Sequence, residues 1–350
     1  MNERIQLEQK TFIEKVLDKK ALIFIIIGIS ARILMFLYYI IADIIGFQEN
    51  WGDTALNFNK NLYYPPLTTI ILTFFRLISF GMVQIFALWA FFWDLITSLM
   101  VYFVLKNFEI QNLKYGFGLF LINPFYFLNN TFGLGKCGYQ MTDAIFFFFF
   151  FLALIYYPKK ELKNRYLFYI FLGLSMCIKY YTLPAIGFLF LFFLVKKNWE
   201  EMKLFLVSVI PLVIIFLVLP FFTLDWFSNQ LFEWYSHEEV IPFYIRIIPS
   251  AIIALLFIIF RLRDSNPFEI IIVSIIGTAA FMFFGYKYIK WFQPLIFYGI
   301  LTEKEFFSFE LNLGFVKRKI IVDNHLATFY LSFVGVFLSL IFIFFEIFSM

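Results

Sequence analysis

The chain is built from apolar runs about as long as a bilayer core is thick. Stretches of roughly 17 to 25 residues with few charges recur along its whole length, and a helix of that length spans the hydrocarbon region. Of all residues, 62% are hydrophobic and 15% are charged, whereas soluble domains carry about 25% charged residues. The sequence therefore predicts an all-α polytopic membrane protein.

The remaining composition excludes several other classes. The net charge is +4, and no basic face suggests a nucleic-acid partner. Cys137 and Cys177 make neither a disulfide framework nor a metal motif. Lysines precede an apolar run that is too long for a signal-peptide core, so we expect an uncleaved first span.

Lysine and arginine mark cytoplasmic loops, and this rule orients the expected spans. We expect a cytoplasmic arm at 1–20, a transmembrane domain at 21–301, a basic cytoplasmic loop at 302–325 and a last transmembrane helix at 326–350. The expected external loops are 47–81, 129–142, 223–245 and 286–290.

The alternation of basic clusters gives about eleven spans. The basic clusters stay on one side of the membrane only if residues 65–80 do not cross the bilayer. We therefore expect an interfacial or re-entrant helix there, beginning at Pro65-Pro66 because proline suits the first turn of a helix. The runs 184–195 and 291–301 are short for a crossing, which leaves their boundaries open.

The same alternation gathers polar and aromatic side chains at the external face. The expected loops and span ends bring together Trp51, Asp53, Tyr63, Tyr64, Gln140, Asp143, Lys179, His237, Lys287 and Lys290. A carboxylate beside cations suits phosphoryl-linked lipid chemistry, because a base must deprotonate an acceptor hydroxyl while cations stabilise a departing phosphate. Solvated loop charges are the alternative interpretation, and a lysine at the end of a span also snorkels to the interface.

Three ionisable residues lie inside expected spans: Arg32, Asp43 and Asp94. Such residues cost roughly 2.5–3.5 kcal/mol at the centre of a helix and usually have a partner or a function. Arg32 and Asp94 are candidates for a buried structural pair, and Asp43, near the outer end, is an alternative catalytic acid. The run 146–151 consists of phenylalanine and is either lipid-facing or packing bulk.

No spacing of His, Asp and Glu resembles a metal site, so we predict no metal ligands. The use of a divalent metal stays open, and His237 is more typical of a surface histidine.

A series of short motifs over residues 25–300 resembles a known family in its order and spacing. The motifs are Arg32 then Asp53, Tyr64-Pro65-Pro66-Leu67, Trp93-Asp94-Leu95, Asn123-Pro124, Gly138…Gln140…Asp143, Lys179-Tyr180-Tyr181…Pro184 and Lys287-Tyr288…Trp291-Phe292-Gln293-Pro294-Leu295. This order is similar to that of the integral-membrane C-type (GT-C) glycosyltransferases that use polyprenyl-phosphate sugars. It is most like the branch with the first mannosyltransferase of glycosylphosphatidylinositol assembly and its prokaryotic relatives.

The resemblance implies inverting transfer of a hexose, with mannose as the first expectation. The donor substrate would be a polyprenyl- or dolichyl-phosphate sugar, and the acceptor a lipid-linked glycan or glycolipid on the non-cytoplasmic face. The membrane would be a prokaryotic plasma membrane or the endoplasmic reticulum.

The resemblance also suggests a role for each candidate residue. Asp53 is expected as the general base or acceptor-orienting carboxylate, and Lys179 with Lys287 or Lys290 as the donor-phosphate site. The side chains expected to contact sugar or acceptor are Trp51, Tyr63, Tyr64, Gln140, Asp143 and His237, since aromatic rings pair an apolar body with polar tips.

Two other functions stay open. A transporter or lipid flippase would place polar groups at the midplane on broken helices and show internal repeats. A non-catalytic membrane subunit is the third reading, and a small membrane partner subunit is compatible with all of them.

Overall fold

The computed structural model describes the chain in segments. They are residues 19–34, 36–37, 66–109, 113–122, 141–157, 159–179, 183–211, 213–214, 248, 251–252, 254–255, 258, 267–271, 273–274, 305–312 and 317–323. The elements are a helix at 19–34 (the N-terminal helix), α3 (Pro66–Ile78), α4 (Val83–Asn107), α5 (Leu113–Leu121), α7 (Met141–Tyr156), α8 (Leu162–Ile178), α9 (Leu183–Val195), α10 (Trp199–Phe205), the short 3₁₀ helix η2 (Leu206–Val209), β1 (Glu305–Asn312) and β2 (Lys317–Asp323). The described part is therefore predominantly helical, as expected.

Within these ranges, one helix is long and apolar enough to cross a bilayer by itself. It is α4, with 25 residues. Shorter apolar helices occupy Leu67–Ile78, Met141–Tyr156 and Ala185–Val195. The expectation of about eleven spans goes beyond what these helices establish.

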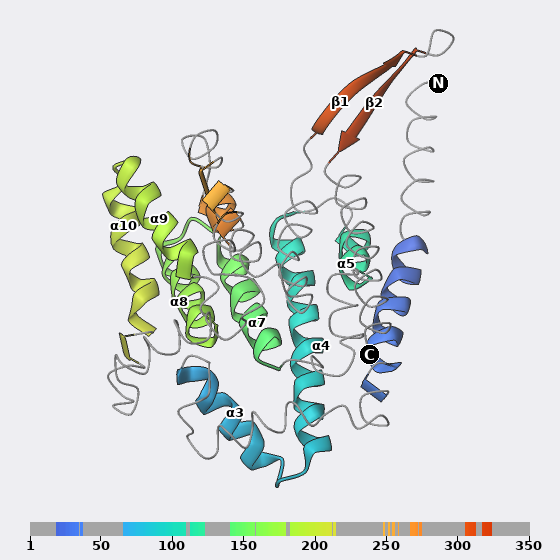
Figure 1. The fold of residues 1–350 in the computed structure, drawn as a ribbon, viewed down its shortest axis with the longest axis vertical. Helices are drawn as coiled ribbons and strands as arrows, with labels where there is room; N and C mark the ends of the chain where they lie inside the picture. The colour runs from blue at the N-terminus through green and yellow to red at the C-terminus, as the bar shows by residue number, and fades with distance from the viewer. Residues whose placement is uncertain are drawn as a thin grey trace.

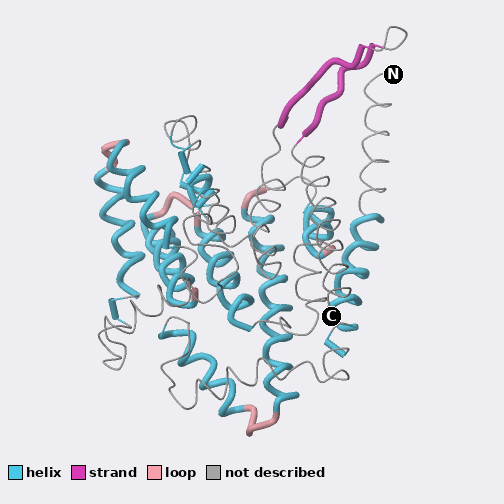
Figure 2. Tube along the Cα trace, in the orientation of Figure 1, coloured by secondary structure: helices cyan, strands magenta, loops and turns pink. Residues whose placement is uncertain are grey.

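The longer helices lie side by side, with α7 between α4 and α8 (Figure 1). α4 and α7 run in the same direction, because Thr97 Oγ1 donates to the Ala144 carbonyl at 2.8 Å and Asn107 Nδ2 to the Ile155 carbonyl at 2.6 Å. α8 follows α7 and returns antiparallel to it (Figure 2). The bundle thus has one end where α4 begins and α8 ends, which we call the α3 end, and an opposite end.

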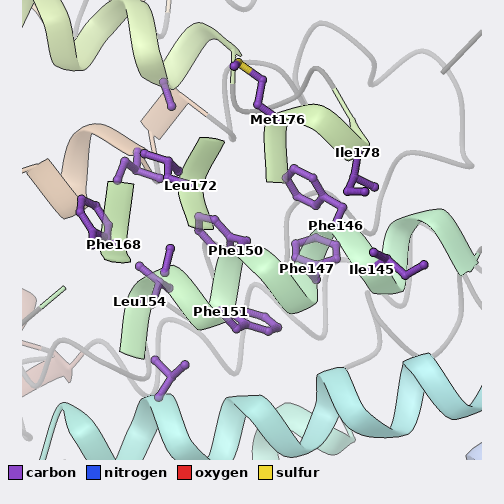
Figure 3. Packing of buried hydrophobic residues seen from close by; sticks show 14 of the residues in the cluster. Ile145, Phe146, Phe147, Phe150, Phe151, Leu154, Phe168, Leu172, Met176 and Ile178 are labelled. Carbon is purple, nitrogen blue, oxygen red and sulfur yellow. The ribbon is translucent and has the colours of Figure 1, made fainter. Parts of the chain in front are cut away.

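The phenylalanine-rich α7 forms the centre of the packing. Phe146, Phe147, Phe150 and Phe151 are almost fully buried. Phe146 and Phe150 lie on the side of α7 that faces α8 (Figure 3), whereas Phe151 packs against Phe120 of α5. Of the two readings of the run 146–151, the structure therefore supports packing bulk for these four rings. Inside lipid such contacts stabilise by dispersion and close fit, because apolar side chains gain little by leaving a hydrocarbon solvent.

Glycines allow two of the closest helix contacts. A Cβ added at Gly28 of the N-terminal helix would lie 2.6 Å from Leu121 Cβ on α5. One added at Gly173 of α8 would lie 1.9 Å from the Ser208 carbonyl oxygen of η2. Small residues at such crossings are typical of helices that pack in membranes.

α3 lies obliquely across one end of the bundle instead of alongside the other helices (Figure 1). It begins at Pro66, in agreement with the helix start expected from Pro65-Pro66. It ends in a turn through Phe80 and Gly81, both with positive φ, and Gly81 at +76° adopts that conformation without strain. The turn leads directly into α4.

Polar contacts join α8 to α10 at the opposite end. Asn198 caps α10 by accepting from the Glu201 N–H at 3.1 Å. Glu201 in turn accepts from Arg165 Nη2 and from the Tyr169 hydroxyl, the latter at 2.8 Å. The hydrogen bond that Arg165 donates to Glu201 raises the pKa of Arg165, so its guanidinium stays charged.

The stretch 302–325, which we expected as a basic cytoplasmic loop, contains an antiparallel hairpin. β1 and β2 pair with Phe309 opposite Ile320 and Glu310 opposite Lys319. The basic residues 317–319 lead into Ile320-Ile321-Val322, and β-branched residues favour strands. The hairpin stands beyond the opposite end of the bundle, away from α3 (Figure 1).

Candidate functional site

Asp143 and Lys179 form a buried ion pair at the α3 end. Asp143 lies in the first turn of α7, and Lys179 is the residue that caps the end of α8. Lys179 Nζ contacts Asp143 Oδ1, and the two side chains are only 5% and 6% exposed. Each charge lies at the helix end that it stabilises, an acid at an N-terminus and a base at a C-terminus.

α3 packs onto the last turn of α8, next to this pair. The Thr68 hydroxyl donates to the carbonyl of Ile178 at 2.5 Å, one residue before Lys179. The Lys179 N–H continues the helical pattern by donating to the Ser175 carbonyl at 3.1 Å. The site is therefore assembled from the first turn of α7, the last turn of α8 and the start of α3.

The pair changes how Lys179 can act. An isolated buried charge would be costly, and pairing offsets part of that cost. Asp143 already neutralises the positive charge of Lys179. Lys179 therefore does not offer its full charge to a phosphate. A phosphate that reached Lys179 would have to compete with the carboxylate and would leave Asp143 able to accept a proton or hydrogen bond.

A second buried pair joins the N-terminal helix to α4. Arg32 Nε lies 3.3 Å from Asp94 Oδ2, and the side chains are 3% and 2% exposed. Arg32 Nη1 also donates to the carbonyls of Gly28 and Leu121, both at 2.9 Å. One guanidinium thus ties together the N-terminal helix, α4 and α5, which favours the structural reading of this pair.

α3 carries a polar face that the sequence analysis did not single out. Thr69, Thr73 and Arg76 follow one another at spacings of four and three residues, which places them along one side of the helix. Thr69 and Arg76 are buried, at 3% and 7% exposure. The helical spacing is visible in the sequence, but none of these three residues was among the candidate site residues.

The other candidate residues lie outside the described residues. They are Asp43, Trp51, Asp53, Tyr63, Tyr64, Gln140, His237, Lys287 and Lys290. Within the part of the chain that the structure describes, no group of three His, Cys, Asp or Glu side chains could hold a metal ion. The described cysteine, Cys177, is buried in α8.

Comparisons with known proteins give no match. No family model matches the chain, and neither a curated protein nor a solved structure is similar enough to count as a match.

Proposed function

We propose that the chain is a multi-pass membrane glycosyltransferase of the GT-C type. It would move a hexose, with mannose as the first candidate, from a polyprenyl-phosphate sugar to a glycolipid acceptor on the non-cytoplasmic face. The observation that carries the proposal is the buried contact between Asp143 and Lys179 beneath α3. These residues come from two separate motifs of the family resemblance, 36 positions apart.

The distribution of charge along the helices supports the proposed orientation. Lys106 at the end of α4, Lys159 and Lys160 between α7 and α8, and Lys196 and Lys197 after α9 all belong to the opposite end of the bundle. Basic residues accumulate on the cytoplasmic side of membrane proteins. The α3 end would then be external, in line with the expected interfacial helix.

Broad apolar exposure supports a lipid environment. The N-terminal helix exposes Leu22, Ile23, Ile26 and Ile27 by 48–58%, although it is tied to the bundle by a buried guanidinium. Exposed apolar surface of this extent is unfavourable in water and suits contact with acyl chains.

In the proposed reaction, the acceptor hydroxyl oxygen forms a bond to the anomeric carbon of the sugar. The bond from that carbon to the phosphate oxygen breaks, and the polyprenyl phosphate leaves with the electron pair. Asp53 is the proposed base that takes the hydroxyl proton. Lys179 stabilises charge on the leaving phosphate, and Asp143, released from Lys179, accepts a hydrogen bond from the sugar or acceptor.

The test uses the purified full-length protein in lipid nanodiscs with polyprenyl-phosphate mannose and a glycolipid acceptor. Lys179→Met is expected to lower turnover by about a hundredfold or more, as for other groups that stabilise developing charge. Asp143→Asn and Asp53→Asn are expected to lower turnover as well. Lys197→Met, at the exposed opposite end, is the matched control and should leave turnover unchanged.

A charge exchange separates chemistry from structure. The double variant Asp143→Lys/Lys179→Asp retains an opposite-charge pair and should restore much of the thermal stability that either single change removes. It should not restore turnover, because the positive charge has moved. Full turnover in the exchanged variant would make the pair structural. A folded wild type that moves lipids across the bilayer but transfers no sugar would favour the transporter alternative.

A further inference from the structure

The packing of α3 leaves two buried hydroxyls unsatisfied. The Oγ1 atoms of Thr69 and Thr73 are shielded from solvent, and neither has a hydrogen-bond partner in the structure as described. Thr68 on the same helix donates to the Ile178 carbonyl, and Thr97 on α4 donates to the Ala144 carbonyl. The buried Thr142 hydroxyl, next to Asp143 on α7, also has no partner among the described residues. A buried hydroxyl without a partner costs about 1–3 kcal/mol, so two on one helix face require an explanation.

These hydroxyls share their side of α3 with a cation. Arg76 follows Thr73 by three residues, and the row from Thr69 to Arg76 extends about 10 Å along the helix. The position of Arg76 in the last turn has a structural explanation, because a positive charge at a helix C-terminus is favourable. The helix dipole therefore explains why Arg76 is favourable at this position, but it does not explain the two buried threonine hydroxyls.

The combination fits an oxyanion. Threonine hydroxyls and a guanidinium all donate hydrogen bonds, and a guanidinium matches the geometry of phosphate oxygens. The row lies on the helix that crosses the end of the bundle, beside the Asp143–Lys179 pair. The row therefore adds one guanidinium and two hydroxyl donors at the end of the bundle where that pair lies.

We infer that the Thr69–Thr73–Arg76 face of α3 binds the phosphate of an isoprenyl phosphate lipid. The inference rests on the proposed function for the lipid part of the ligand, and it assigns residues that the family motifs do not include. Phosphate oxygens would accept from both hydroxyls, and the isoprenyl chain would remain in the bilayer.

A binding measurement tests this site without any sugar transfer. Full-length protein in nanodiscs is titrated with a short-chain isoprenyl phosphate, with the matching isoprenyl alcohol and with inorganic phosphate. The variant Thr69→Val/Thr73→Val removes both hydroxyls and keeps the side-chain shape. It should weaken isoprenyl phosphate binding about tenfold or more and leave binding of the alcohol unchanged. Arg76→Gln should weaken the same interaction.

Stability supplies the matched control. Removing hydroxyls that have no partner should leave the melting temperature unchanged or raise it, because no hydrogen bond is lost. Thr97→Val removes a hydroxyl that is satisfied, so it should lower the melting temperature and leave isoprenyl phosphate binding intact. The opposite pattern, with the Thr69→Val/Thr73→Val variant unstable and binding like wild type, would overturn the inference.

The remaining outcomes also decide between explanations. Loss of alcohol binding together with phosphate binding would indicate a distorted fold and refute a phosphate site. Equal affinity for inorganic phosphate would refute the lipid part of the ligand. If the variant binds isoprenyl phosphate normally while wild type transfers mannose, this site fails and the proposed function stands. If binding is lost in the variant but wild type transfers no hexose, the site stands and the proposed function fails.

Discussion

The Arg32–Asp94 pair allows the most quantitative prediction. Arg32→Met leaves Asp94 buried without its cation and removes the donor to the Leu121 carbonyl. Breaking a buried ion pair by removing one partner costs about 3–5 kcal/mol. A lost hydrogen bond between helices in a bilayer adds about 0.6–1.7 kcal/mol. The expected loss of unfolding free energy is therefore about 4–7 kcal/mol.

The two single variants should differ in a defined direction. Asp94→Leu leaves Arg32 with two carbonyl acceptors, at Gly28 and Leu121, so it should cost about 1–2 kcal/mol less than Arg32→Met. The double variant Arg32→Met/Asp94→Leu removes both charges of this pair. It should lie within about 2 kcal/mol of wild type, since replacing a buried pair by apolar side chains is often neutral.

Reversible unfolding in mixed micelles, titrated with a denaturing detergent and followed by tryptophan fluorescence, measures these differences. Lys197→Met serves as a surface control, expected within about 0.5 kcal/mol of wild type. The reasoning is refuted if the double variant is as unstable as Arg32→Met. A stable double variant that has lost sugar transfer would instead place Arg32 or Asp94 in the chemistry.

Two further predictions concern α8 and α9. Gly173→Ala should destabilise by about 3 kcal/mol or more, because the added Cβ would lie 1.9 Å from the Ser208 carbonyl oxygen. Gly187→Ala on α9 is its control, since a Cβ there meets nothing within 4 Å. This control variant should be more stable than wild type by up to about 1 kcal/mol through helix propensity. Equal melting temperatures of the two variants would contradict the close contact between α8 and η2. Tyr169→Phe should cost about 1.5–3 kcal/mol by removing the hydroxyl bond to charged Glu201, and an unchanged unfolding free energy would show that this bond contributes nothing.

Local signals predicted several elements well. Pro65-Pro66 indicated where α3 begins, and the unbroken apolar run from 82 to 105 corresponds to α4. The apolar run 166–181 overlaps α8, Leu162–Ile178, which starts four residues earlier. The first turn of α8 contains charged residues, so the apolar run does not include it. An apolar run indicates where a helix can lie in lipid, and it does not indicate helical turns that extend into water.

The partners of individual side chains could not be read in the same way. Lys179 was assigned to a phosphate because its position at the end of a span suggested an available cation, but the fold gives it a carboxylate from a helix 36 residues away. Thr69 and Thr73 were overlooked since threonine is unremarkable in an apolar helix. Their significance depends on burial and on the neighbours that satisfy Thr68 and Thr97, which only three-dimensional packing determines.

The guanidinium of Arg32 also bears on how such a chain is made. Its acceptor at Leu121 lies 89 residues further along the sequence. At about 5–20 residues per second, the ribosome needs roughly 4–18 seconds to supply that carbonyl. For the membrane-spanning chain that we propose, the first helix must wait during this interval, either at the lipid–water boundary or beside the insertion machinery. The first helix would then reach its final position in the bilayer only after α5 has been synthesised.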